Sequence, residues 1–159
     1  MAVGLALPET RLVLDNDIFT HWRSQQAYVL KPIAEYQSSI KYLPSLTSIT
    51  VFETLSGFEK ISFKLRGLSE SAKRSRIRAE QLIGNCIVLP FDQNAAAIAA
   101  YIFPRLSQSD RNKHWRDMFI AATALAHGHG VATGNRRDFE LIANLLPGSQ
   151  ILRLAVWKP

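Results

Sequence analysis

The stretch Leu12-Val13-Leu14-Asp15-Asn16-Asp17-Ile18-Phe19 decides how this chain folds. Residues 11–14 form a short apolar run that predicts a buried β-strand, and Asp15 stands where this run ends. A helical pattern follows from Ile18 to about Leu30, before Pro32 interrupts it. An acidic residue between a strand and a helix is typical of α/β domains, because their ligand sites form at the carboxyl ends of parallel strands.

Three further acids stand where an apolar segment begins or ends. They are Glu53, Asp117 and Asp138. Parallel strands bring such residues together although they lie far apart in the sequence. We therefore predict a cluster of four carboxylates that binds a divalent metal, in a hydrolase that acts on phosphates.

The remaining segments alternate between strands and helices. We predict strands at 46–49, 86–89, 131–133 and 150–156, helices at 50–67, 69–83, 92–106, 115–127 and 138–146, and a polar loop at 107–114. This alternation predicts a parallel sheet with helices on both faces. No repeat, low-complexity tract or linker marks a boundary, so we expect a single domain over residues 1–159.

The composition is that of a folded domain in a reducing compartment. Of 159 residues, 47% are hydrophobic and 20% are charged, which excludes a disordered chain. Cys86 is the single cysteine, so no disulfide can form within the chain, and its neighbours 87–89 predict a buried strand. The first residues do not make a signal peptide, and no apolar run approaches the roughly 20 residues that span a bilayer. We expect a cytoplasmic protein without a membrane segment.

The charge is uneven along the chain. Nineteen Lys and Arg against thirteen Asp and Glu give a net charge of +6, which makes a polyanionic partner plausible. One basic group lies at 73–78 and is in the first instance a solvated helix face. A second group flanks two of the four acids: Arg111, Lys113, Arg116, Arg136 and Arg137.

Each acid also has a purely structural explanation. Thr50 to Glu53 fits a capping box, in which the glutamate bonds the first amide of a helix. Asp117 and Asp138 are favourable in first helical turns, and Asp15 is a suitable N-cap. Independent caps, however, have no reason to lie within longer matching segments.

Four segments carry a resemblance to PIN-domain ribonucleases, and among them to VapC-type toxins of bacterial toxin–antitoxin pairs. They are Leu12-Val-Leu-Asp15-Asn-Asp17-Ile-Phe19, Thr47-Ser-Ile-Thr50-Val-Phe-Glu53-Thr-Leu-Ser-Gly57, Arg116-Asp117-Met-Phe-Ile120-Ala-Ala-Thr-Ala-Leu125, and Val131-Ala-Thr133-Gly-Asn135-Arg-Arg-Asp138-Phe139. They follow the family's order and approximate spacing and span almost the whole chain. The resemblance implies a PIN-like three-layer α/β/α fold with a central parallel sheet.

The resemblance also implies an endoribonuclease that uses Mg²⁺ or Mn²⁺ to hydrolyse RNA phosphodiester bonds. Asp15 and Asp117 would be primary metal ligands, Glu53 a ligand or a residue that orients water, and Asp138 a ligand to a second metal or through water. Asn135 shares the place of the family's last acid with Asp138. Many relatives have asparagine where this chain has Asp17, so Asp17 adds a carboxylate and leaves the exact ligand set open.

The other polar residues of these segments take supporting roles. Thr133, Asn135, Asp17 and Ser48, with Thr50, are candidates to hold the ligating carboxylates by hydrogen bonds. Arg116, Arg136 and Arg137 are candidates to bind the RNA backbone, because a guanidinium bonds a phosphate through two N–H groups. His21, His114, His127 and His129 have no spacing that predicts a metal site.

The resemblance further implies two protein partners, a small antitoxin encoded beside the toxin and a second copy in a homodimer. The apolar side chains Phe52, Phe58, Ile61 and Phe63 suit either interface, but a helical stripe of this kind more often faces a core.

Two alternatives remain open. One is a haloacid-dehalogenase-like phosphatase, because Leu14-Asp15-Asn16-Asp17 resembles that family's paired aspartates, although its downstream lysine has no clear counterpart here. The other is a non-catalytic RNA-binding PIN module, although none of the four acids is missing.

Overall fold

A parallel sheet forms the centre of the molecule. The computed structural model describes residues 3–159, and its main sheet has the strand order β1-β6-β5-β2 with every pairing parallel. The strands are β1 (Val3–Leu5), β2 (Leu12–Leu14), β5 (Gly130–Thr133) and β6 (Leu152–Val156). A short parallel pair, β3 (Leu46–Thr47) and β4 (Val88–Leu89), continues beyond β2, to which Ser45 connects it by backbone hydrogen bonds.

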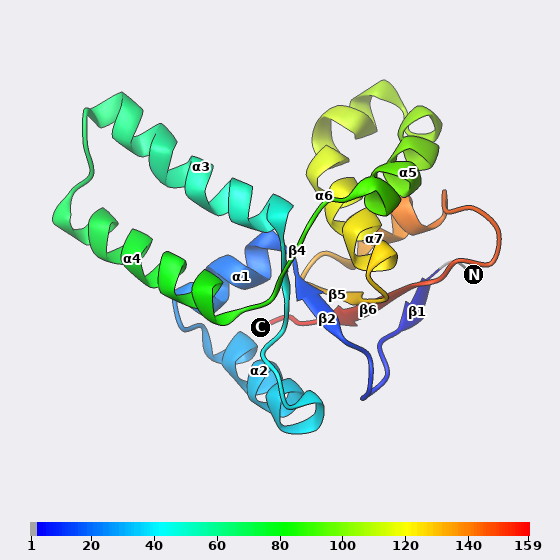
Figure 1. Ribbon diagram of the computed structural model, residues 1–159, viewed down its shortest axis with the longest axis horizontal. Coiled ribbons are helices and arrows are strands. Elements are labelled where there is room, and N and C mark those ends of the chain that lie inside the picture. The colour runs from blue at the N-terminus through cyan, green and yellow to red at the C-terminus, as the bar shows by residue number, and fades with distance from the viewer. Residues whose placement is uncertain (1–2) are drawn as a thin grey trace.

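Between residues 3 and 159 the chain forms seven α-helices (Figure 1). They are α1 (Asn16–Arg23), α2 (Ala27–Ile40), α3 (Ser48–Leu65), α4 (Glu70–Asn85), α5 (Gln93–Ile102), α6 (Gln108–Ala126) and α7 (Arg136–Ala143), with a 3-10 turn at Phe103–Arg105. None of these helices is long and apolar enough to cross a membrane.

The helices cover both faces of the sheet, and each face has its own core. Side chains alternate between the faces of a strand, so Val13 packs with α5, α6 and α7 while Leu12 and Leu14 pack with α1 and α2. Val131 and Ala132 of β5 divide in the same way. The predicted three-layer α/β/α fold is confirmed.

Close packing at the start of β5 requires a glycine. A Cβ added to Gly130 would lie 2.7 Å from the carbonyl oxygen of Arg153 and 3.1 Å from Cδ2 of Leu12. Gly130 therefore lets β5 fit between β2 and β6, and Asp15 at the end of β2 bonds the Ala132 carbonyl of β5.

The first predicted helix is wrong in its boundaries. It ends at Arg23, and α2 then runs through Pro32 without a break. The interruption is at Gln25, whose φ of 58° leaves the helical region, and the Ser24 hydroxyl there bonds the carbonyls of Thr20 and His21. Pro32 lies near the start of α2, where it removes a single helical hydrogen bond.

Two helices begin earlier than predicted. Thr47, not Thr50, caps α3, and its hydroxyl accepts a hydrogen bond from the Thr50 amide at 3.2 Å. The predicted loop at 107–114 is instead the start of α6, because the Ser107 hydroxyl accepts a bond from the Asp110 amide at 3.1 Å. The polar residues at 108–114 therefore belong to the first turns of a helix and not to a loop.

The region after α4 is less buried than predicted. Cys86 is partly buried, and burial raises the pKa of its thiol to about 11, in keeping with an unreactive group. Ile87 and Val88 are exposed, however, because β4 lies at the edge of its two-stranded sheet. Strand β1 was not predicted; it pairs in parallel with β6.

Helices α3 and α4 form a hairpin that extends away from the sheet (Figure 1). Its apolar residues do not all face inward: Phe58 is 8% exposed, whereas Phe63 is 88% exposed and Phe52 and Ile61 are also exposed. The prediction that this group packs in a core holds for Phe58 alone.

Candidate metal centre

Asp15 is held in place at the junction of β2 and α1. Its backbone amide bonds the Ala132 carbonyl of β5, and its Oδ1 accepts the Ile18 amide at 2.9 Å as the N-cap of α1. The residue is 5% exposed, and burial raises the pKa of its carboxyl to about 7. Hydrogen bonds from the Thr133 side chain and the Ile18 amide lower the pKa, and the charges of Asp17 and Asp117 raise it. An N-cap role alone does not explain this burial.

Glu53 lies in the second turn of α3, so it is not the last member of a capping box. Its side chain is 15% exposed, and Oε1 is buried without a hydrogen-bond partner among the described residues. Burial raises the pKa of Glu53 to about 7, against the positive charge of Arg116, whose Nε lies 3.7 Å from Oε2. A buried carboxylate oxygen without a donor is suited to a cation or a water molecule.

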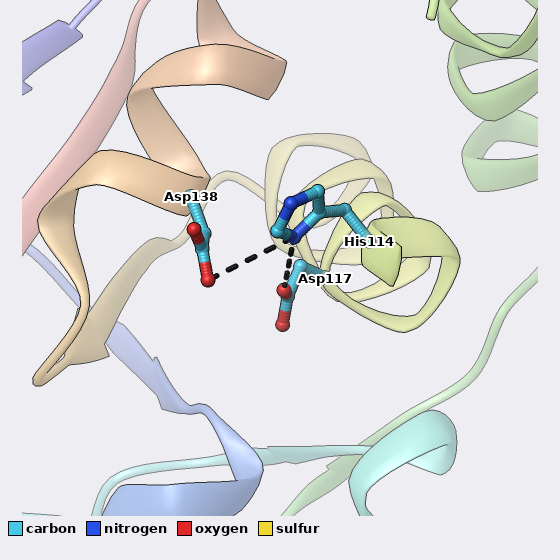
Figure 2. A group of neighbouring side chains, drawn as sticks. All are labelled: His114, Asp117 and Asp138. Atoms are coloured by element: carbon cyan, nitrogen blue, oxygen red, sulfur yellow. Dashed lines mark hydrogen bonds and ion pairs between the residues drawn. The ribbon is translucent and has the colours of Figure 1, made fainter. Parts of the chain in front are cut away.

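Asp117 and Asp138 meet at His114, as Figure 2 shows. Nδ1 of His114 lies 3.5 Å from Oδ2 of Asp117 and 3.7 Å from Oδ2 of Asp138. One ligand atom from each residue lies within 4.8 Å of the others, which is a spacing that one metal ion can span. Asp117 stands in the middle of α6, so the first-turn explanation is wrong for it, whereas Asp138 does lie in the first turn of α7.

The charge of Asp117 acts on the other acids, although the close group of ligand atoms among the described residues contains only His114, Asp117 and Asp138. The pKa of Asp117 is raised to about 6, mainly by burial and also by the charges of Asp138 and Asp17, whereas the contact with His114 lowers it. The charge of Asp117 in turn raises the pKa values of Asp15 and Glu53. Carboxylates that repel one another and are poorly hydrated favour protonation or a divalent cation.

Two of the predicted supporting residues contact a carboxylate. The Thr133 side chain hydrogen-bonds Asp15, and its Oγ1 also accepts the Asn135 amide at 2.9 Å. Nδ2 of Asn135 donates a hydrogen bond to Oδ2 of Asp138. These contacts fix the orientation of two carboxylates, as is common for metal ligands.

Ser48 does not take the predicted role. Its Oγ accepts the Phe91 amide at 3.1 Å, so it connects α3 to the segment after β4 and not to an acid. Helix α3 begins at Ser48, and this early start turns its side chain toward that segment. Thr50 does not bond an acid either. Its hydroxyl donates a hydrogen bond to the backbone carbonyl of Leu14, next to Asp15, at 3.3 Å. Asp17 is exposed beside the site and acts on the other acids through its charge.

The three predicted RNA-binding arginines differ in their surroundings. Arg116 lies over the Trp115 ring, 4.5 Å from its centroid, and faces Glu53. Arg136 pairs with Glu140 on the exposed side of α7. Arg137 is exposed next to it and has no ion pair among residues 3–159.

His114 was missed in the sequence because its segment was predicted as a loop. A histidine three residues before an aspartate is informative only on a helix, where both side chains share a face. The signal that places both on one helix is Ser107 with Asp110 three residues later, which is an N-cap pattern.

The residues present fit a divalent metal. They offer carboxylate oxygens from three helices and one imidazole nitrogen, and Glu53 Oε1 has no other partner between residues 3 and 159. Mg²⁺ prefers oxygen ligands, and Mn²⁺ also accepts imidazole.

Comparisons with known proteins agree with the geometry. The model of the PIN domain family matches residues 16–145. The DNA-bound VapBC structure from Salmonella typhimurium has a TM-score of 0.70 and 25% identity, covering 94% of this chain and 99% of that chain. VapBC-5 from Mycobacterium tuberculosis has a TM-score of 0.61 and 21% identity, covering 92% and 98% respectively.

A third similar structure is FitAcB from Neisseria gonorrhoeae, with a TM-score of 0.56 and 24% identity, covering 90% of this chain and 95% of that chain. No curated protein matches the chain in sequence. The family match and the VapBC structures confirm the resemblance inferred from the four sequence segments.

Proposed function

The chain belongs to the PIN domain family, and on that premise we propose that it is a metal-dependent endoribonuclease and the toxin of a VapBC-type toxin–antitoxin pair. The observation that carries this proposal is the group of buried carboxylates with raised pKa values, in which Glu53 Oε1 has no partner among the described residues. Such a group is costly for the fold, and a bound cation compensates its charge.

Each acid then has a specific task. Asp15 and Asp117 are the primary ligands of Mg²⁺ or Mn²⁺, and Asp138 binds a second ion or acts through water. Glu53 is a ligand or accepts a hydrogen bond from the attacking water through Oε1. When bound, the ion supplies positive charge beside the phosphodiester and makes that water more acidic.

The neighbouring residues keep this arrangement in place. His114 lies between Asp117 and Asp138 and reduces their mutual repulsion when it donates to them. Thr133 and Asn135 orient Asp15 and Asp138. Arg116, which reaches the site beside Glu53, binds a phosphate of the RNA, and Arg137, which has no ion pair among residues 3–159, binds another.

The proposed role implies partners and a location. The solved VapBC structures contain a toxin with its antitoxin, and we extend that pairing to this chain, with a small antitoxin and a homodimer of the toxin. The exposed Phe52, Ile61 and Phe63 of the α3–α4 hairpin provide apolar surface for such contacts. A cytoplasmic location and a single domain over residues 1–159 remain predictions.

The phosphatase alternative has no support from the family match. In addition, Asp17, which would be its acid–base residue, is exposed, whereas Glu53 and Asp138, which it does not use, lie at the site. Binding of RNA without catalysis is the second alternative, and the experiment below distinguishes it.

The test is cleavage of total cellular RNA by the purified protein, with Mg²⁺, with Mn²⁺ and with a chelator. D15N and D117N are the matched variants, because asparagine keeps the shape of each side chain and also serves as an N-cap at position 15. We expect discrete products that depend on the metal and disappear in both variants. Cleavage that persists in both folded variants would contradict the proposal, and binding without cleavage would favour the RNA-binding module.

A further inference from the structure

A cavity between α1, α3 and α4 is lined by the residues whose buried polar atoms the fold leaves without partners. Four buried side-chain atoms of the described residues have no hydrogen-bond partner: Asn16 Oδ1, Arg23 Nε, Glu53 Oε1 and Thr54 Oγ1. All four residues line this one cavity, whose volume is about 320 Å³. Native proteins satisfy nearly all buried polar atoms, so four exceptions at one place point to a polar ligand.

We propose that this cavity binds one nucleotide of the RNA substrate, next to the bond that is cut. The inference rests on the proposed function, because it assigns the cavity a part of the same substrate. It concerns residues outside the carboxylate group, with Glu53 as the one residue that both sites share.

Arg23 provides the anion-binding end of the cavity. Its guanidinium lies 5.5 Å from the Phe19 ring centroid and 5.6 Å from the Phe58 ring centroid, and Nη2 is 3.4 Å from Oγ1 of Thr20. No carboxylate pairs with it among residues 3–159. Burial lowers its pKa, so the guanidinium is poorly hydrated and gains from an anion.

A second hollow extends this end toward α4. Thr20, Arg23 and Ser75 line both spaces, and Ser24 and Arg78 complete the second one. Two guanidinium groups and several hydroxyls are the donors that bind a phosphate group. They also favour a polyanion over a protein segment, because exposed Lys73 and Arg74 increase the positive charge of α4.

The lining of the cavity also suits a base. Gly57, Phe58 and Ile61 form an apolar wall, against which a base can lie. Asn16 Oδ1 and Thr54 Oγ1 are acceptors for the N–H groups of its edge.

The position of the cavity defines which nucleotide it holds. Asn16 directly follows Asp15, and Glu53 belongs both to the cavity and to the carboxylate group. A nucleotide in the cavity is therefore adjacent to the phosphate that reaches the acids.

The first test is affinity for a short labelled single-stranded RNA of random sequence, measured with a chelator present so that no cleavage occurs. R23Q and R78Q should each weaken binding, and R23Q by about 10- to 100-fold, because a charged hydrogen bond to phosphate is lost. R74Q removes an exposed charge of α4 outside both hollows and should change affinity by about 2-fold or less. R23K should restore part of the affinity.

The second test uses T54V, which removes a buried unpartnered hydroxyl while it keeps the shape of the side chain. We expect an unchanged or higher melting temperature, and a changed base preference beside the cut in sequenced cleavage products. R23Q proteins enter the comparison only when their melting temperature shows that they are folded. T54V products identical to wild type would overturn the base-binding assignment.

The outcomes separate this inference from the proposed function. If wild type does not cleave RNA, the proposed function fails, and the chelated binding assay still decides the cavity. Equal RNA affinities of R23Q and R74Q overturn the inference even when wild type cleaves. If R23Q weakens binding of the antitoxin and leaves RNA affinity unchanged, the cavity belongs to the protein partner and the inference is overturned.

Discussion

The carboxylate edge of the sheet and the α3–α4 hairpin are built in opposite ways. At the sheet edge, acids lie on elements packed against two cores, and three of them are so buried that their pKa values rise. The hairpin extends from the sheet (Figure 1). It exposes Phe63, Leu65 and several basic residues of α4. The proposed chemistry therefore depends on burial of charged groups, whereas the proposed protein contacts use exposed apolar surface of the hairpin.

Glu53 lies on α3 of the hairpin and also belongs to the carboxylate group. Of the substitutions considered, E53Q should therefore have the largest effect on cleavage. We expect cleavage to fall on the order of 100-fold or more, since loss of a supporting contact to a metal ligand alone costs 10- to 100-fold. E59Q is the control on the same helix, because Glu59 is exposed and paired with Arg76. Initial rates of RNA cleavage measure the effect, and equal rates for both variants would place Glu53 outside the chemistry.

The cost of burial at the sheet edge predicts a pH dependence of stability. The pKa of Asp15 rises from 3.8 to about 7 on folding, so the folded protein binds more protons than the unfolded chain between these values. Without metal, the free energy of unfolding should therefore fall as pH rises from about 4 through 7. D15N should flatten this dependence and raise the free energy of unfolding at pH 8 by about 1 to 3 kcal/mol.

Denaturant titrations of the chelated protein at several pH values measure this difference. E35Q, an exposed substitution on α2, serves as the control and should follow wild type. A wild-type stability that rises between pH 5 and 8 would show that Asp15 is not destabilised by its burial.

His114 is expected to position two of the acids, and its substitution tests this role. H114A removes the ring that separates Asp117 from Asp138, and we expect cleavage to fall about 10-fold, as for other residues that position metal ligands. K113A changes the exposed neighbour and should stay within about 2-fold of wild type. If H114A cleaves as fast as K113A, the histidine is a bystander at the site.

The smallest effect on cleavage and stability is expected for exposed Phe63 of the hairpin. F63S should leave the unfolding free energy within about 0.5 kcal/mol of wild type and the cleavage rate unchanged, because the ring is 88% exposed. F58A on the same helix should cost about 3 kcal/mol, since its ring is buried. If Phe63 lies in a partner interface, F63S should weaken the dimer or antitoxin binding, which sedimentation and titration measure.

The sequence was sufficient to predict the fold where the apolar residues of a segment had one clear periodicity or the segment had one clear boundary. The apolar run before Asp15, the alanine-rich Asp117 helix and the strand before Asn135 were all found, and their order was enough for the parallel sheet. The four acids were predicted to lie together; Asp117 and Asp138 meet at His114, and the charge of Asp117 raises the pKa values of Asp15 and Glu53.

The errors arose where the sequence offered more than one start for a helix. Both Thr47 and Thr50 are suitable caps, and the packing of Leu46 beside β2 selected Thr47. That choice moved Ser48 away from the acids and Glu53 into the second turn. The polar start of α6 concealed His114, because exposed helix faces and loops have similar composition.

The most direct measurement is Mn²⁺ binding, followed by electron paramagnetic resonance at pH 8 for wild type, D15N, D117N and E59Q. We expect wild type and E59Q to bind the ion alike, and D15N and D117N to bind it at least about 10-fold more weakly, since each lacks a charged ligand. Equal Mn²⁺ affinity in all four folded proteins would contradict the claim that these carboxylates form a metal centre.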